Sequence, residues 1–237
     1  MKIALLGYGK MGKAIEQVAL QRGHEIVLRA TSDTIFSNAQ LQNADVAIEF
    51  SRPEAAVHNF ERCFRCGVPC VTGTTAWSAQ LENVLAACAK YYGSFLYASN
   101  FSIGVQVFME INRRLAELMN TRNDYEVSMT EVHHTQKLDA PSGTAITLAN
   151  DVIARLDRKT AWHYPPQDFD TQLLNIAALR IDPAPGTHTV AYDSPIDTIE
   201  ITHTAHSRLG FATGAVVAAE FLYDKVGVFT MREVLSL

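Results

Sequence analysis

The chain has 237 residues, of which 48% are hydrophobic and 19% charged, a composition typical of a globular protein with one large core or two modest ones. This composition excludes disorder, collagen and coiled coil. Twenty basic and 25 acidic residues give a net charge of −5, so the chain lacks the general positive field that binds a nucleic-acid backbone. No run of about 18 apolar residues predicts a membrane span, and the apolar start stops at Gly7, too early for a signal peptide. We therefore expect a soluble cytoplasmic protein with no nucleic-acid and no membrane partner.

The first hundred residues alternate between short apolar runs and helical patterns. Apolar residues recur at helical spacing up to Gly23, which ends the first helix. A later helix contains Pro53 in its first turn, has Ser51 and Glu54 at capping-box spacing, and ends at Gly67. Such alternation predicts a parallel sheet covered on both faces by right-handed crossovers. The predicted strands are residues 2–6, 25–30, 45–50, 68–72 and 94–97, and a further helix is expected at 78–92.

The pattern changes after about residue 100. Three strand-like runs follow one another without helical spacers, which favours a mixed or antiparallel sheet. A last helix, at 214–222, is expected to return to the first domain. The other predicted elements are helices at 103–119 and 144–156, a strand at 125–131, a stretch containing Pro165 and Pro166, and the strand-like runs 173–181, 187–192 and 197–202.

These elements predict an α/β protein with an N-terminal Rossmann-type doubly wound parallel sheet and a second α+β domain with a mixed sheet. We expect residues 1–102 and 209–237 to form a dinucleotide-binding domain. Residues 103–208 are expected to form the second domain.

The cysteines offer little chemistry. Cys63 and Cys66 have the C-x-x-C spacing of zinc and redox sites, but no second pair completes a zinc site. Both lie in a predicted helix at spacing that faces a core, where free cysteine is common. We expect no metal.

A glycine motif, G-x-G-x-x-G, lies directly after the first strand and at the start of the first helix. Its first glycine permits a tight turn, the second lets backbone approach a pyrophosphate, and the third lets helix and strand pack closely. The helix N-terminus then meets phosphate with unpaired N–H groups. The predicted cofactor-binding residues here are Gly7, Tyr8, Gly9, Lys10, Met11 and Gly12.

The most polar stretch begins at Glu131 and contains His133, His134 and Lys137. Two histidines and a lysine in one loop are expensive to bury, so we expect them to line a wet cleft. The run Ser142, Gly143 and Thr144 then opens a helix, whose positive end suits a carboxylate. This pattern predicts a small anionic ligand.

The run E-V-H-H-x-x-K-x-D-A-P-S-G-T-A, at residues 131–145, resembles the signature of the dihydrodipicolinate reductase family. The resemblance spans the chain. It includes residues 7–12, Glu49-Phe-Ser-Arg-Pro-Glu54, Gly73-Thr-Thr75, Asn100-Phe-Ser102, Ser207-Arg208 and Phe211-Ala-Thr-Gly-Ala-Val216.

Membership would imply reduction of dihydrodipicolinate to tetrahydrodipicolinate in lysine and diaminopimelate biosynthesis, with a hydride from NADPH or NADH. The resemblance makes His133 the proton donor and Lys137 a further acid or a substrate contact. It further implies a homotetramer assembled through the sheet of the second domain. The substrate carboxylates would lie on His134, Ser142, Gly143 and Thr144, and the nicotinamide half of the cofactor along Gly73, Thr74, Thr75, Ala98, Ser99, Asn100 and Phe101.

The chain departs from the family pattern at three points. Ala76 stands where glycine is usual, and because alanine disfavours positive φ we expect the nicotinamide loop to differ slightly. Ser99 stands where proline is common. The stretch after Arg180 is also unusual, which leaves its assignment to the substrate site open.

The choice between the two cofactors depends on the end of the second strand. NADH-selective enzymes usually place a carboxylate there, and by strand position that site is Thr31. Hydroxyls of Thr31 and Ser32, helped by Arg29, favour a 2′-phosphate. Asp33 either turns back towards the ribose or caps a turn. We predict that both cofactors work and that NADPH is preferred.

Two other functions remain open at this point. One is a different Rossmann dehydrogenase acting on an imino acid or an amino-acid semialdehyde. The other is a non-catalytic protein that binds the dinucleotide and reports redox state. A sensor has no need of His133, His134, Lys137 and Thr144 together, so this set favours the reductase.

Overall fold

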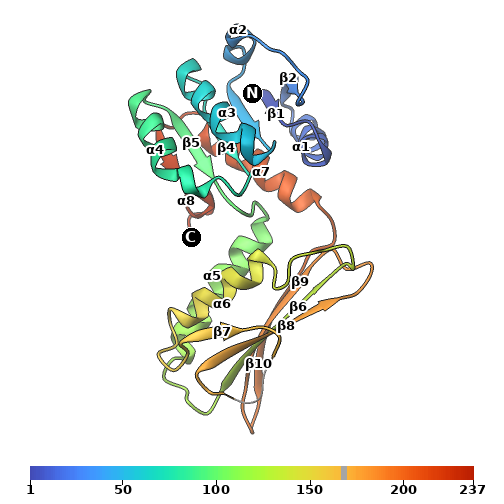
Figure 1. Ribbon diagram of the computed structural model, residues 1–237, viewed down its shortest axis with the longest axis vertical. Coiled ribbons are helices and arrows are strands. Elements are labelled where there is room, and N and C mark those ends of the chain that lie inside the picture. Colours follow the sequence, from blue (N-terminus) through green and yellow to red (C-terminus); the bar gives the residue numbers. More distant parts are fainter. Residues whose placement is uncertain (167–169) are drawn as a thin grey trace. The chain divides into compact units, whose positions relative to one another are not determined.

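The computed structural model describes residues 1–166 and 170–237 (Figure 1). The chain divides into two compact units. Met1–Ile103 and Arg208–Leu237 form the first unit, and Gly104–Ser207 the second.

The first unit contains a six-stranded sheet in the order β11-β5-β4-β3-β1-β2, with every neighbouring pair parallel. This order confirms the predicted doubly wound sheet, whose order reverses at β1 and β3. Its strands are β1 (Lys2–Leu6), β2 (Glu25–Ala30), β3 (Val46–Glu49), β4 (Cys70–Thr72), β5 (Ser94–Tyr97) and β11 (Gly227–Phe229).

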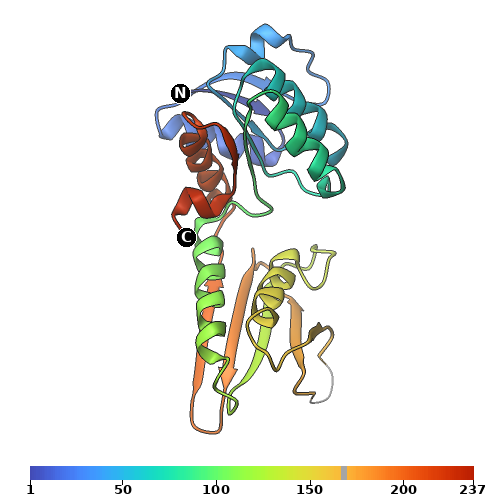
Figure 2. The same ribbon diagram turned by 90° about the vertical axis from the view of Figure 1, so that its left-hand side faces the viewer.

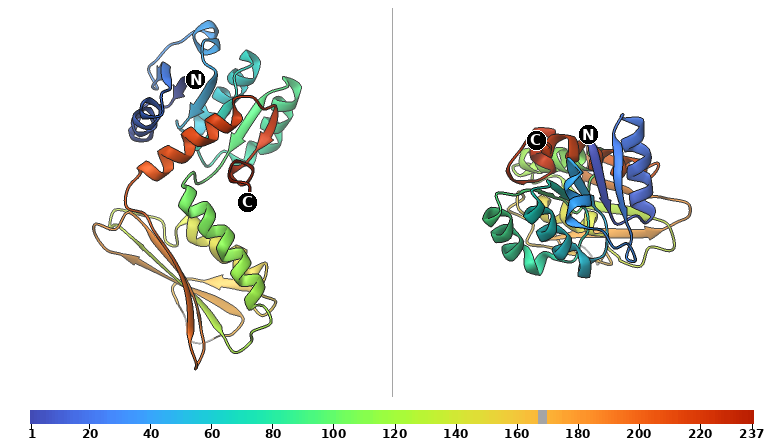
Figure 3. Two further views of the ribbon diagram at one scale, coloured as in Figure 1. Left: turned by 180° about the vertical axis from the view of Figure 1, so that it is seen from behind. Right: turned by 90° about the horizontal axis from the view of Figure 1, so that it is seen from above.

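Helices cover both faces of this sheet because its strands are apolar on both sides (Figure 3). Side chains such as Ile3 and Leu5 face one core, and Ala4 and Leu6 face the other. The C-terminal segment, red in Figure 2, adds a helix and the edge strand β11 to this unit. One face is covered by α1 (Lys10–Gln21), α7 (Leu209–Leu222) and α8 (Met231–Leu235), the other by α2 (Asn38–Gln42), α3 (Pro53–Cys66) and α4 (Leu81–Lys90), with a 3₁₀ turn η1 at Ser78–Gln80.

The predicted capping box at Ser51 is wrong. Arg52 is the N-cap of α3 and makes no side-chain cap bond, with Pro53 following at the start of the helix. The Ser51 hydroxyl instead donates to the buried carboxylate of Glu49. A predicted helix boundary also moves, because α7 starts at Leu209 rather than at residue 214.

The second unit contains a five-stranded mixed sheet in the order β10-β9-β6-β8-β7, which confirms the predicted sheet type. Strands β6 and β7 run parallel to β8, whereas β9 runs antiparallel to β6 and β10. Sequence reasoning missed β7, which lies in the proline-containing stretch. The strands are β6 (Glu126–His133), β7 (Ala161–His163), β8 (Leu173–Arg180), β9 (Thr187–Asp193) and β10 (Thr198–Thr204).

Two helices, α5 (Ile103–Met119) and α6 (Gly143–Ile153), pack on one face of this sheet (Figure 1). Most of this face is apolar because alternate residues of the inner strands are apolar and buried, including Met129, Ile176 and Val190. In the described ranges, no helix is long and apolar enough to cross a membrane.

The cysteines are reduced and largely buried. Cys63, Cys70 and Cys88 are inaccessible, and Cys66 is half-buried. Burial raises the pKa of the Cys66 and Cys88 thiols, which disfavours the reactive thiolate.

Candidate active site

The glycine turn lies at the carboxyl end of β1, beside the reversal of strand order. Gly7 has a φ of 104°, and a Cβ there would lie 2.1 Å from the Phe50 carbonyl oxygen, so only glycine fits. A Cβ on Gly12 would lie 2.3 Å from the carbonyl oxygen of Gly7. By contrast, the space around Gly9, the N-cap of α1, is open, and no side chain caps the helix there. This open, uncapped end has the form of a phosphate cradle.

Three cavities follow the carboxyl ends of β1 to β5. The first has a volume of about 520 Å³ and reaches from the glycine turn to Thr31. The second, of about 250 Å³, shares Phe50 with the first, and the third, of about 240 Å³, shares Thr74 with the second. The predicted residues that line them are Gly7, Tyr8, Gly9, Met11, Thr31, Gly73, Thr74, Thr75, Ala98 and Ser99.

The other predicted cofactor residues are not among those that line these cavities. Phe101 is buried, with its ring centroid 5.6 Å from that of Phe50. The Asn100 side-chain oxygen accepts a hydrogen bond from the Ser102 N–H at 2.8 Å. Lys10 is exposed in the first turn of α1.

A buried carboxylate that sequence reasoning did not assign, Glu49, organises the two central loops. It accepts the Thr72 hydroxyl at 2.7 Å and the Ser51 hydroxyl, and the Ser51 N–H donates to the Thr74 hydroxyl at 2.9 Å. These bonds fix the loops after β3 and β4 relative to each other. An acidic residue at the end of an otherwise apolar strand was the signal for it.

Ala76 takes a backbone conformation that alanine disfavours. Ala76 has a φ of 62°, the left-handed conformation that a glycine would take at no cost. The loop therefore carries strain of about 1–2 kcal/mol at this alanine, and the expected difference from the glycine version stays a prediction.

The Arg29 side chain is paired within the first unit, and its predicted help in binding a phosphate stays a prediction. Arg29 donates to Glu16 at 2.8 Å, and Glu16 also accepts the hydroxyl of Tyr8, so the guanidinium is engaged on α1. Thr31 begins a tight turn in which its N–H donates to the Thr34 hydroxyl at 2.9 Å. Two arginines that were not predicted, Arg52 and Arg62, line the cavity next to it.

In the second unit, strand geometry gathers four ionisable side chains. Glu131 and His133 are two residues apart on β6, so both point to the helix-covered face. His188 on β9 pairs directly with Glu131, and Arg180 on β8 pairs with His133. Neither His188 nor Glu131 was predicted as a site residue, and Arg180 was left open. Their shared location follows from strand register, which the sequence alone does not specify.

Glu131 is fully buried, yet ionised. Its Oε1 accepts the Arg180 guanidinium at 3.1 Å and the Ser142 N–H at 3.0 Å. Burial alone would raise the pKa of Glu131, but the hydrogen bonds from the Ser142 N–H and Arg180 and the nearby His188 imidazole outweigh burial and lower the pKa to about 2. For His133, which is 8% exposed, burial lowers the pKa to about 4 despite the nearby carboxylate.

The loop after β6 carries the remaining predicted groups. The Lys137 ammonium pairs with Asp139 at 2.7 Å, and the Thr135 hydroxyl donates to Asp182 at 2.6 Å, which ties the loop to the segment after β8. His134 is half-buried in this loop, and its carbonyl accepts the N–H of Lys137 at 3.1 Å.

Ser142 is the N-cap of α6. Its hydroxyl accepts the Ala145 N–H at 3.2 Å and lies 3.1 Å from Nε2 of His188. The next two residues, Gly143 and Thr144, form the first turn, and the position beside Gly143 is open. The helix end thus presents N–H groups for an anion, while the Ser142 hydroxyl is used within the protein.

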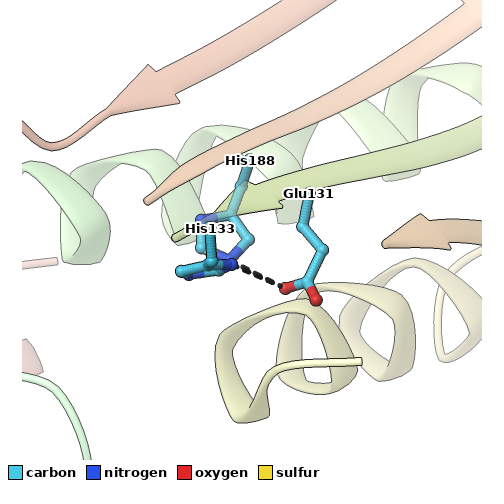
Figure 4. A group of neighbouring side chains, drawn as sticks. All are labelled: Glu131, His133 and His188. Carbon is cyan, nitrogen blue, oxygen red and sulfur yellow. Dashed lines mark ion pairs between the residues drawn. The ribbon is translucent and has the colours of Figure 1, made fainter. Parts of the chain in front are cut away.

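Glu131, His133 and His188 are also residue types that bind metals, and one ligand atom from each lies within 4.8 Å of the others (Figure 4). The Arg180 guanidinium already binds this carboxylate, and the charge of Lys137 acts on His133. We therefore interpret the group as a proton-handling cluster, and the absence of a metal stays a prediction.

Comparisons with known proteins agree with the motifs. Family models for the N-terminus and the C-terminus of dihydrodipicolinate reductase match residues 1–101 and 104–235. The 4-hydroxy-tetrahydrodipicolinate reductase of Christiangramia forsetii is 50% identical over 236 residues, covering 100% of this chain and 98% of that protein. Its namesake in Neisseria gonorrhoeae is 33% identical over 233 residues, covering 94% of this chain and 84% of that protein.

Solved structures show the same fold. Dipicolinate-bound dihydrodipicolinate reductase from Paenisporosarcina sp. TG-14 has a TM-score of 0.78, with 97% of both chains covered at 19% identity. An amine dehydrogenase from Mycobacterium smegmatis has a TM-score of 0.63 at 11% identity, covering 97% of this chain and 94% of that one. The two family models together match nearly the whole chain, and a relative matches it at 50% identity. The chain therefore belongs to the dihydrodipicolinate reductase family.

Proposed function

We propose that the protein reduces 4-hydroxy-tetrahydrodipicolinate, or the dihydrodipicolinate formed by its dehydration, to tetrahydrodipicolinate in lysine and diaminopimelate biosynthesis. The observation that carries the proposal is the 50% identity, over the full length, to a protein named for this reaction. The bound cofactor, NADPH or NADH, supplies the hydride.

The first unit holds the dinucleotide. The open N-terminus of α1 at Gly9 accepts the pyrophosphate, and the loops at Thr74 and Ser99 take the nicotinamide half. Neighbouring cavities share lining residues and follow the carboxyl ends of the strands, where open α/β sheets bind their ligands.

NADPH is the preferred cofactor. Thr31, Ser32 and Arg52 line the 520 Å³ cavity, and their hydroxyls and guanidinium suit a 2′-phosphate. Arg62 also lines it, with its guanidinium donating to Asn38 at 2.9 Å. In the described part of the chain, the residues lining this cavity do not include Asp33, which lies in the turn that Thr31 begins.

Cofactor choice is tested by kcat/KM with each dinucleotide. We expect Thr31→Asp to reverse the preference, because a carboxylate accepts from the ribose hydroxyls and repels the phosphate. Asp33→Asn is the matched control and should leave the ratio unchanged. A tenfold preference of the parent protein for NADH, lost in Asp33→Asn, would show that Asp33 holds the ribose.

The second unit binds the substrate and supplies the proton. The N–H groups of Gly143 and Thr144, with His134 and the Ser142 cap beside them, hold the carboxylates at the positive end of α6. His133 is the proton donor. Lys137, released from Asp139, is a further acid or a substrate contact.

Activity is tested by supplying the product of the preceding synthase with NADPH and following the loss of reduced-nicotinamide absorbance. The same assay with small imino acids and amino-acid semialdehydes separates this reductase from other Rossmann dehydrogenases. Binding of NADPH without turnover of any of these compounds would instead identify a redox sensor.

The sheet of the second unit offers a surface for self-association. Its face opposite α5 and α6 carries small and hydroxyl side chains, and in Figure 3 no helix of this unit covers it. Together with the family resemblance, this face supports a homotetramer, and the reduced cysteines support a cytoplasmic location. Sedimentation analysis of the parent and of Thr130→Lys, on this face, tests the assembly. A monomeric parent protein would contradict it.

A further inference from the structure

The carboxylate of Glu131 has one oxygen in use and one without a hydrogen-bond partner. Oε1 is bound by Arg180 and the Ser142 N–H, whereas Oε2 is buried and makes no hydrogen bond to any residue that the structure describes. Oε2 lies 3.5 Å from Nδ1 of His133 and 3.6 Å from Nε2 of His188 (Figure 4).

The facing atom, Nδ1 of His133, is likewise buried and without a hydrogen-bond partner among residues 1–166 and 170–237. Two buried polar atoms that face each other at this distance are costly unless a proton lies between them. A lone pair on Nδ1 would face a negative oxygen, so the ionised carboxylate selects the form of His133 that carries its proton on Nδ1.

The other ring nitrogen, Nε2, is then the one that exchanges protons. A Cβ at Gly186 would lie 3.0 Å from this nitrogen, so glycine leaves the space beside it free. Gly186 directly precedes β9, the strand that carries His188. The same segment thus places one imidazole beside Glu131 and, by having no side chain at Gly186, avoids crowding Nε2 of the other.

We infer that Glu131 is a positioning residue for the proton donor His133: held ionised by Arg180 and the Ser142 backbone, it keeps a proton on Nδ1 and presents Nε2 to the substrate. The inference rests on the proposed function, in which His133 gives a proton to the substrate. The donor is the imidazolium form of His133: the substrate gains one hydride and one proton, the proton leaves Nε2, and the ring remains neutral with Nδ1 protonated until solvent restores the Nε2 proton.

The charges around His133 make this support necessary. Burial and the charges of His188, Lys137 and Arg180 all lower its pKa, and Glu131 is the group that raises it. Removal of the carboxylate charge should therefore lower the pKa of His133, so that the imidazolium loses its proton at lower pH. The arrival of a dicarboxylate substrate adds negative charge and acts in the same direction as Glu131.

The test is Glu131→Gln, which keeps the size of the side chain and an oxygen for Arg180 but removes the charge. We expect kcat to fall about 10- to 100-fold and the basic limb of the kcat profile to move about one pH unit lower. The KM for the substrate and the Kd for NADPH should change less than threefold. Glu25→Gln, at an exposed position on β2 in the first unit, is the matched control and should leave the profile unchanged.

A lower kcat with an unchanged pH profile would overturn the inference. If Glu131 had only a structural role, its substitution would lower kcat without shifting the basic limb of the kcat–pH profile. If Glu131→Gln does not fold, Glu131→Asp serves instead, with partial kcat and a smaller shift of the same sign expected.

Imidazole nitrogen NMR of the full chain provides a readout that needs no turnover. We expect His133 of the parent protein to be protonated on Nδ1 at neutral pH and Glu131→Gln to lose this preference. Protonation of the parent on Nε2 alone would contradict the inference, even if the protein is an active reductase. An inactive parent with Nδ1 protonated would instead contradict the proposed function and leave the tautomer assignment supported.

Discussion

Acidification should destabilise the second unit through His133. Its pKa is about 4 in the folded protein, against 6.5 for an unperturbed histidine, chiefly because burial disfavours the charged ring. As the pH falls, His133 therefore binds a proton at a higher pH in the unfolded chain than in the folded protein. The stability that His133 contributes is complete above about pH 6.5 and is lost as the pH falls towards 4. At 1.36 kcal/mol per pKa unit, the loss amounts to about 3 kcal/mol.

Urea unfolding can isolate this effect. The chain has two tryptophans, and Trp162 packs against the core of the second unit, so a Trp77→Phe background makes fluorescence report that unit. Between pH 7 and pH 4.5, the free energy of unfolding should fall about 2–3 kcal/mol less in His133→Gln than in its parent. His206→Gln, at an exposed histidine, is the control and should behave as the parent. Equal losses in His133→Gln and the parent would refute the reasoning.

Three further substitutions have defined outcomes. Ala76→Gly should raise the free energy of unfolding by up to about 1 kcal/mol in urea titrations, because relief of left-handed strain exceeds the entropy cost of glycine; a loss of stability would show that the alanine is unstrained. Ser142→Ala removes the cap of α6 and should cost about 1 kcal/mol, measured by thermal unfolding against the parent. Thr144→Val should raise the substrate KM about 5- to 30-fold with a smaller effect on kcat, and an unchanged KM would place the substrate elsewhere.

Much of the fold could be predicted because its elements carry local signals. The structure confirms β1, β2, β5 and α5 at the predicted bounds, since each is a strongly apolar run or a long amphipathic pattern. The short elements α2, β7, β11 and α8 were missed. The three-residue strands have no periodicity of their own and depend on their neighbours. The two short helices each begin with a capping box, Ser37 with Gln40 and Thr230 with Glu233, which is the local signal that could have found them.

The candidate site likewise contains residues that local sequence predicts and residues that only the strand pairing brings together. The glycine turn and the loop at His133 are contiguous in sequence, so their chemistry could be read locally. The relation of Glu131 to His188 needs the register of β6 with β9, and that of Arg180 needs the pairing of β6 with β8. Ala76 shows a further limit, because a loop fixed by its surroundings imposes a backbone form that the residue itself disfavours.

The most direct test of the account is the turnover of His133→Ala and Lys137→Ala with the synthase product and NADPH, measured beside NADPH affinity by fluorescence titration. The account predicts that each variant loses about 10²-fold or more in kcat, while the Kd for NADPH stays within a few-fold of the parent because neither residue lies in the first unit. Near-normal kcat in both variants would contradict the claim that the second unit supplies the proton for the reduction.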